Sequence, residues 1–200
     1  MEFTRLLRER KSVHSFDDRE VSRQKVVDIL ETARFAPSAW NLQPWEVIVL
    51  DSEDSKAEAV ASSYDQAFLS DADKILVIAG DERFDEHLDE ALTDSVSKGY
   101  MTEEEAASHR KTVEEFRGRR WEWKELELTA NCMFLASAVL NAAHERGLGA
   151  CPVKGFDQEE LAERLGLQQL YPILLIPIGY PAEDLEKKWR REPEDLIEFR

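Results

Sequence analysis

The most constraining feature of the sequence is a long stretch, from Trp121 to Arg146, whose apolar residues leave almost no polar face. Its segment ELELTANCMFLASAVLNAAHERG is rich in Ala, Ser, Asn and Cys, and Gly147 is typical of a helix terminator. A helix that is apolar nearly all round is buried on most of its sides. The sequence therefore predicts a central helix against which the other elements pack. Its small residues also allow another backbone to approach closely, including the same helix in a second subunit.

The remaining patterns predict helices and short strands within a single domain, because 200 residues suffice for one well-packed domain and are few for two. Helices are predicted at 2–11, 23–36 (capped by Ser22, stopped by Pro37), 52–67 and 157–165 (capped by Asp157 with Glu160), and strands at 46–50, 74–79 and 171–178. Prolines are expected to disrupt part of the third strand. Strands separated by helices, with several helices after the second strand, predict an α+β or α/β sandwich.

Residues 81–118 form a charged excursion from this pattern, helical in period and poor in apolar residues. Thr102 and Glu105 have the spacing of a capping box that opens one of its helices. Two interpretations remain equally open: a lid or dimer arm, and a solvated helical surface without a role. The C-terminal tail, residues 187–200, is charged and has no core pattern before Leu196 and Ile197.

Charge and composition exclude several classes of function. The formal net charge of −16 repels nucleic-acid phosphates and anionic membranes, so neither is expected as a partner. The longest apolar runs reach about half of the roughly 20 residues that a membrane helix needs, and the N-terminus has no signal-peptide pattern. Cys132 and Cys151 show no metal-ligand spacing and suit a reducing compartment, so a cytoplasmic location is expected. No HExxH, GxSxG, GxGxxG or Walker motif and no Cys–His pairing is apparent, and the scattered histidines predict no metal site.

A basic cluster near the N-terminus stands out against this acidic background. The segment RERKSVHSF contains Arg8, Arg10, Lys11, Ser12 and His14. A helix that runs to Lys11 would place basic residues at its negative dipole end, which is a sufficient structural reason for them. The alternative is an anion site, because guanidinium groups bind phosphate through two hydrogen bonds and a serine hydroxyl can add another.

Three further segments combine rigid backbone with polar groups. FAPSAWNLQPW, residues 35–45, joins a helix stop to a strand start, and its carboxamides Asn41 and Gln43 need partners if they are buried. A flavin ring would supply such partners, whereas the simpler interpretation uses Trp40 and Trp45 only as core. GLGACPVKGFD, residues 147–157, is either an ordinary loop or a place where Gly155 admits a planar ligand. WRRE, residues 189–192, is solvated tail when considered alone.

Taken together and in this order along the whole chain, these segments resemble the nitroreductase family of FMN-dependent NAD(P)H oxidoreductases. RKSVHSF, APSAWNLQPW, the long helix of small residues, GLGACPVKGFD, the IGYP near Gly179 and the basic pair before Pro193 all carry the resemblance. It implies an α+β sandwich with a central, mostly antiparallel sheet flanked by helices. It also implies an intertwined homodimer with FMN sites at the subunit interface.

The resemblance also implies which residues hold the cofactor. Arg10, Lys11 and Ser12 would hold the FMN phosphate and ribityl chain, and Arg191 would join them from the tail. A second group, Pro37, Ser38 and Asn41, would reach the flavin from the other subunit. Pro152, Lys154 and Gly155 would lie beside the ring, with backbone N–H groups near its reactive N5 atom.

His14 stands where many relatives carry Arg or Lys, near N1 and O2 of the flavin. A histidine there is charged only part of the time at neutral pH, so activity or flavin potential is expected to vary around pH 6 to 7. Lys154 stands where some relatives have an acidic residue, and Trp189 where a basic residue is sometimes found.

The implied function is hydride transfer from NADH or NADPH through flavin N5 to a nitroaromatic, quinone or similar small-molecule acceptor, by a ping-pong mechanism without a catalytic side chain. Two alternatives remain open at this point. The same fold could carry specialised flavin chemistry, such as reductive dehalogenation or flavin breakdown. It could also be a non-catalytic flavin-binding protein.

Overall fold

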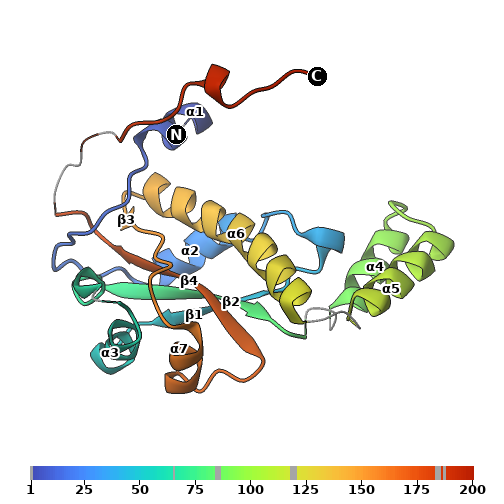
Figure 1. The fold of residues 1–200 in the computed structure, drawn as a ribbon, viewed down its shortest axis with the longest axis horizontal. Coiled ribbons are helices and arrows are strands. Elements are labelled where there is room, and N and C mark those ends of the chain that lie inside the picture. The colour runs from blue at the N-terminus through green and yellow to red at the C-terminus, as the bar shows by residue number, and fades with distance from the viewer. Residues whose placement is uncertain (1, 65, 84–86, 118–120, 183–185, 187) are drawn as a thin grey trace.

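The computed structural model describes residues 2–64, 66–83, 87–117, 121–182, 186 and 188–200. Its centre is a four-stranded sheet in the order β1-β2-β4-β3, formed by β1 (Trp45–Leu50), β2 (Lys74–Asp81), β3 (Gly149–Ala150) and β4 (Leu170–Gly179). Each neighbouring pair of strands is antiparallel (Figure 1). The predicted α+β class and antiparallel sheet are therefore confirmed. The short strand β3 was not predicted, because its Gly-rich sequence carries no strand pattern.

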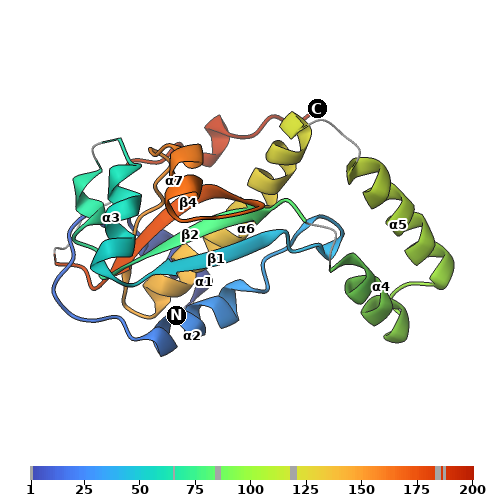
Figure 2. The same ribbon diagram turned by 90° about the horizontal axis from the view of Figure 1, so that it is seen from below.

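Helices cover both faces of the sheet, and the alternation of side chains along β2 separates two cores. Leu76 and Ile78 belong to the core under α2 (Arg23–Ala33) and α6 (Trp121–Glu145). Ile75 and Val77 belong to the other core, with Ala59 of α3 (Glu53–Ala61) and Leu161 of α7 (Gln158–Arg164). Figure 2 shows the sheet between these two helical layers. Because both faces are covered, all eight residues of β2 are buried.

The prolines of β4 disturb only part of the strand, as the sequence predicted. Pro177 lies opposite Ile75 in regular register, and the one register shift falls between Ile78 and Ala79, opposite the segment that contains Pro172. A proline lacks an N–H donor but keeps its carbonyl acceptor. Here both carbonyls are used: the Cys151 N–H donates to Pro177 at 3.4 Å, and the Gln158 side-chain amide donates to Pro172 at 2.6 Å.

Several helices end earlier than predicted, for local reasons. α1 (Phe3–Glu9) does not run to residue 11, and Arg10 already has extended backbone angles. α2 ends at Ala33 instead of residue 36, because the chain turns ahead of Pro37. α3 ends at Ala61 instead of residue 67, where the hydroxyls of two serines bond back to helix carbonyls and compete with continuation of the helix.

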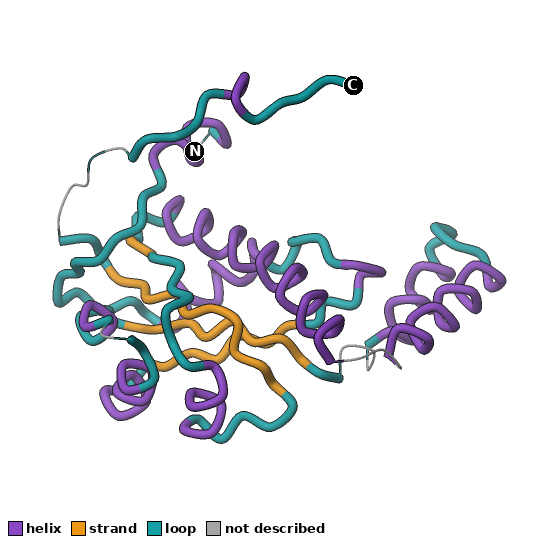
Figure 3. Tube along the Cα trace, viewed as in Figure 1, coloured by secondary structure: helices purple, strands orange, loops and turns teal. Residues whose placement is uncertain are grey.

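The charged excursion is helical, as predicted. α4 (Leu88–Ser97) and α5 (Glu103–Arg117) form a hairpin that projects from the end of the body near the start of α6 (Figures 1 and 3). The predicted capping box is present, with Thr102 N–H bound to Glu105 and Glu105 N–H bound to the Thr102 hydroxyl. The hairpin also carries an ion pair between Arg110 and Asp89 at 2.7 Å.

α6 is the central helix that the sequence predicts, and Gly147, with φ of 75°, follows its end. Within the described residues, its segment Lys124–Glu145 is the one helix long and apolar enough to cross a membrane. Half of the segment's apolar window is buried inside the protein. One side of α6 remains uncovered, since Leu126 and Phe134 are 59% and 53% exposed.

Candidate functional site

A basic cavity lies between the end of α1 and the C-terminal tail. Its volume is about 380 Å³, and its lining consists of Leu7, Arg8, Arg10, Lys11, Ser12, Lys188 and Arg190. Five of these seven residues are cationic, in a chain whose formal net charge is −16. Such a local concentration of positive charge favours an anionic ligand.

The shape of this cavity depends on a close contact between two distant segments. The Val13 N–H donates to the Ala150 carbonyl at 3.1 Å, so the chain after Arg10 runs along the short strand β3. Gly149 makes this approach possible, because a Cβ at that position would lie 2.8 Å from Val13 Cγ1. The basic residues are therefore not simply the last turn of a helix, since only Arg8 lies in that turn.

Arg10 has the clearest requirement for a ligand. Its Nη1 atom is buried and has no hydrogen-bond partner among the described residues. Burial lowers the pKa of Arg10, and the positive charge of Arg190 lowers it further. A buried donor without a partner is unfavourable, and an anionic oxygen would satisfy both the hydrogen bond and the charge. These residues therefore fit a phosphate group.

The tail places Arg190, and not Arg191, in the lining of this cavity. The Arg191 guanidinium instead donates to the carbonyl of Asp195 within the turn η3 (Pro193–Asp195). The two arginines are adjacent in sequence, and a resemblance alone does not distinguish which side chain faces inward. In this chain Arg190 lines the basic cavity, and cofactor binding by Arg191 remains a prediction.

His14 and Cys151 form a contact that the sequence analysis missed. His14 Nε2 lies 3.2 Å from Cys151 Sγ, although 137 residues separate them. The sequence shows no Cys–His pairing that suggests hydrolysis, and the structure brings this cysteine and histidine together from distant segments. Only the alignment of Val13 with Ala150 brings the two residues together, and no local spacing announces it. Burial raises the pKa of the Cys151 thiol, so the pair is not arranged as a nucleophile and base.

The segment 37–45 forms a rigid, unusual loop at the other end of α6. Trp40, Asn41 and Gln43 have φ values of 50°, 56° and 48°, in the left-handed region that residues other than glycine rarely adopt. The Ser38 hydroxyl accepts the Gln43 N–H at 3.0 Å. Such backbone strain persists only where surrounding contacts hold it.

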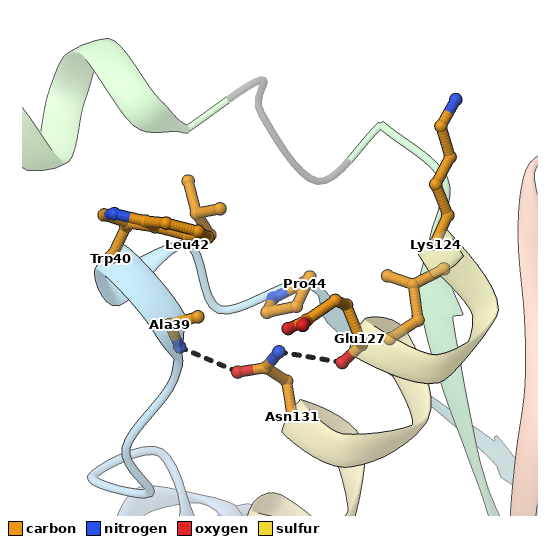
Figure 4. Close-up of a pocket in the computed structure, with 8 residues that line it drawn as sticks. Ala39, Trp40, Leu42, Pro44, Lys124, Glu127 and Asn131 are labelled. Atoms are coloured by element: carbon orange, nitrogen blue, oxygen red, sulfur yellow. Dashed lines mark hydrogen bonds between the residues drawn. The ribbon is translucent and has the colours of Figure 1, made fainter. Parts of the chain in front are cut away.

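Asn131 of α6 supplies the main contact that holds this loop. Its side-chain oxygen accepts the Ala39 N–H at 2.7 Å, and its amide donates to the Glu127 carbonyl at 2.8 Å (Figure 4). Both interactions lie beside a small cavity of about 20 Å³ lined in part by Trp40. Asn41 and Gln43 are exposed, and the Gln43 side-chain amide donates to the Asn41 carbonyl at 3.4 Å. Asn131 was absent from the predicted site, because an Asn within a helix of small residues carries no distinctive sequence signal.

The segment 152–155 contributes both backbone and a cation. Pro152 and Lys154 are exposed, and the Gly155 carbonyl accepts the Tyr64 N–H at 3.1 Å. A Cβ at Gly155 would lie 3.2 Å from the Gln66 amide nitrogen, so the position is crowded. Burial lowers the pKa of Lys154, and the Glu125 carboxylate partly opposes this shift.

One chain does not bring the basic cavity and the loop 37–45 together. The loop is held at Asn131. Arg10 instead lies near His144, because its charge, after burial, lowers the pKa of that histidine. Thirteen residues of α6 separate these two anchor points, which corresponds to about 20 Å along the helix. No residue of the loop belongs to the lining of the basic cavity.

The chain is similar in sequence and in fold to several known proteins. A relative from Thermus thermophilus, named NADH dehydrogenase, is 31% identical over 88% of this chain and 84% of its own length. A provisionally named NAD(P)H:FMN oxidoreductase from Staphylococcus epidermidis has a crystal structure with a TM-score of 0.90 and 28% identity, covering 99% of this chain and 95% of that one. A provisionally named nitroreductase from Exiguobacterium sibiricum, crystallised with FMN, shares the fold at 22% identity, with a TM-score of 0.89 over 100% of this chain and 98% of that one. The family model described as "Nitroreductase family" matches residues 7–180, and the chain belongs to the nitroreductase family.

Proposed function

We propose that this protein is an FMN-dependent NAD(P)H oxidoreductase that reduces a nitroaromatic, quinone or similar small molecule. The observation that carries the proposal is the buried, unpartnered Nη1 of Arg10 in a basic cavity of about 380 Å³. A terminal phosphate is the group that these side chains fit, and FMN carries one. Family membership and the names of the relatives support the same cofactor and NADH or NADPH as the donor.

The chain would hold the cofactor through two sets of groups. Arg10, Lys11 and Ser12, with Arg190 from the tail, bind the phosphate and the adjoining polyol. The exposed amides of Asn41 and Gln43 meet the polar edge of the ring. When bound, FMN supplies the redox chemistry, accepting a hydride from NAD(P)H and passing electrons to the acceptor in a separate half-reaction. The role of the protein is then to position both reactants and exclude water.

The site is completed by a second copy of the chain in a homodimer. The accessible surface is 12,361 Å². A compact monomer of 23.1 kDa exposes about 9,700 Å², so the excess is roughly 2,700 Å². Figure 1 shows the C-terminal tail leaving the body of the protein. Apolar side chains are exposed in this tail, on α1 and along α6: Phe3, Leu7, Leu126, Phe134, Leu196, Ile197 and Phe199. Burial of these side chains in a partner is what an obligate dimer of this family requires.

The homodimer would also explain why the loop 37–45 and the basic cavity lie apart within one chain. In a twofold dimer, the loop of one subunit can reach the cavity of the other, which satisfies both halves of each site. The α4–α5 hairpin, which projects beside the loop, would then be a lid or dimer arm. A cytoplasmic location belongs to the same proposal, since a reduced nicotinamide donor and free thiols both suit that compartment.

The first experiment is the visible absorption spectrum of the purified protein, before and after anaerobic addition of NADH or NADPH. A flavin spectrum that bleaches supports the cofactor and the first half-reaction together. Steady-state NAD(P)H oxidation with a quinone then tests turnover. A protein that is colourless and does not take up FMN would overturn the proposal. A flavin that neither nucleotide reduces would favour flavin breakdown or a non-catalytic role.

Sedimentation analysis tests the homodimer separately. The wild type is expected to sediment as a dimer, and Phe134→Glu is expected to weaken it, because Phe134 is 53% exposed on the uncovered side of α6. Val27→Glu is the matched control, since Val27 is similarly exposed, at 49%, on α2. A monomeric wild type that binds FMN with full occupancy would refute the shared site.

A further inference from the structure

The contact between His14 and Cys151 is surrounded by other specific contacts. Sγ lies 3.2 Å from Nε2 of His14, and the Phe68 ring packs against the imidazole with centroids 4.6 Å apart and planes inclined at 57°. Ser12, which lines the basic cavity, forms a β-bridge with Ala150, the residue before Cys151. The Nδ1 edge of His14 makes no hydrogen bond within the described part of the chain. The thiol therefore contacts one specific nitrogen of the imidazole, close to the wall of the basic cavity.

The chemistry of the two groups decides the direction of this hydrogen bond. Burial raises the pKa of the Cys151 thiol, so it carries its proton at neutral pH and can donate. Sulfur is a weak acceptor, whereas an unprotonated imidazole nitrogen is a strong one. The other acceptor in reach of the thiol, the Pro152 carbonyl, is 3.8 Å away. The favourable arrangement is the one in which the thiol donates to Nε2.

We propose that Cys151 is a positioning residue that holds neutral His14 in the tautomer with its proton on Nδ1. The exposed edge of the ring then presents an N–H donor, because a neutral imidazole that accepts at Nε2 keeps its single proton on Nδ1. In the charged imidazolium both nitrogens carry protons, so Nδ1 is a donor in either state. A histidine at this position thereby keeps the hydrogen-bond donor that an arginine would provide, without its permanent charge.

The consequence for the cofactor rests on the proposed function. A flavin offers a carbonyl acceptor at its pyrimidine edge, and the Nδ1–H of His14 would donate to that type of group. Loss of one neutral hydrogen bond weakens binding by roughly 2- to 10-fold. Without the thiol, His14 would divide its proton between the two nitrogens, and part of the population would present a lone pair to the carbonyl.

The test is the tautomer of His14, measured by long-range ¹H–¹⁵N correlation spectra of the cofactor-free protein. The measurement is made well above the ordinary histidine pKa of about 6.5, and His14→Gln assigns the signals. Wild type is expected to carry the proton on Nδ1. Cys151→Ala is expected to shift it towards Nε2, whereas Cys151→Ser, which keeps a donor of similar size, restores the Nδ1 form. Cys132→Ala is the matched control, since that thiol is buried elsewhere, 3.7 Å from the Pro44 carbonyl.

FMN affinity, followed by flavin fluorescence, gives an independent readout. Cys151→Ala is expected to raise the FMN dissociation constant roughly 2- to 10-fold, and Cys151→Ser to stay near wild type. A wild-type proton on Nε2, or a tautomer unchanged in Cys151→Ala, overturns the inference. Equal FMN affinity in all variants overturns its cofactor consequence. If the tautomer shifts as expected but no variant binds FMN, the positioning role stands and the proposed function fails.

Discussion

Arg10 allows the phosphate site to be tested separately from the rest of the flavin site. The variant Arg10→Met keeps an unbranched side chain of similar length and removes the charge and the buried Nη1 donor. In the holoprotein that donor would bind a phosphate oxygen. Hydrogen bonds to charged groups contribute about 1.5–3 kcal/mol, so the FMN dissociation constant is expected to rise about 10- to 150-fold.

The same substitution has the opposite effect on the cofactor-free protein. Without a ligand, Nη1 is a buried donor that lacks a partner, and such a group is unfavourable by about 1–3 kcal/mol. Removing it also relieves the repulsion from the neighbouring charge of Arg190. The free energy of unfolding of the apoprotein is therefore expected to stay unchanged or to rise.

Fluorescence titrations with FMN and with riboflavin isolate the phosphate contribution, because riboflavin lacks the phosphate. Arg10→Met is expected to weaken FMN binding and to leave riboflavin binding nearly unchanged. Denaturant unfolding of the apoprotein gives the stability. Arg23→Met is the control, since Arg23 is 87% exposed and pairs with Asp51 far along the chain from the cavity residues. An unchanged ratio of FMN to riboflavin affinity, with a less stable apoprotein, would refute the reasoning and make Arg10 a structural residue.

Three further predictions follow from single contacts. Asn131→Leu removes the acceptor of the Ala39 N–H and is expected to lower the free energy of unfolding by about 1–3 kcal/mol, measured with denaturant. Asn131→Asp keeps the oxygen and is expected to lose less stability. Equal losses in the two variants would contradict the role of that oxygen. Gly149→Ala would place a Cβ 2.8 Å from Val13 Cγ1. It is expected to lower the free energy of unfolding by about 1–3 kcal/mol and to weaken FMN binding. A variant as stable as wild type would show that the two segments separate easily. Burial and the hydrogen bond to Glu125 raise the pKa of Tyr171 to about 12, against an ordinary value of about 10. The folded state therefore holds the phenol proton more tightly than the unfolded state does. Stability is expected to fall as pH rises from about 10 to about 12. Tyr171→Phe is expected to lose that part of the alkaline decline in melting temperature, and an unchanged slope would assign the decline to other groups.

The prediction of the helices and strands succeeded where a repeating pattern spans several turns or a whole strand. α6 and its terminating Gly147 follow from apolar residues over seven turns, and β2 and β4 from continuous apolar runs. Ends of helices were less accurate. α3 stopped at Ala61 because serine hydroxyls took up backbone carbonyls, a local competition that composition does not resolve.

The site residues were also easiest to predict where they lie close together along the chain. Arg10, Lys11 and Ser12 were predicted from a basic cluster within nine residues, and they lie together in the basic cavity. In the tail, Arg190 lines the basic cavity, whereas Arg191 binds the Asp195 carbonyl. Cofactor binding remains a prediction for all the site residues: Arg10, Lys11, Ser12, His14, Pro37, Ser38, Asn41, Pro152, Lys154, Gly155 and Arg191.

The sequence by itself determined the fold class, the family and the segments that carry the site, because each depends on residues that are close together along the chain. Only the tertiary structure decided which of these segments meet. The alignment of Val13 with Ala150 puts His14 against Cys151, and the length of α6 holds the loop at Asn131 apart from Arg10. Both outcomes depend on the register and packing of elements more than 90 residues apart, which local sequence patterns do not encode.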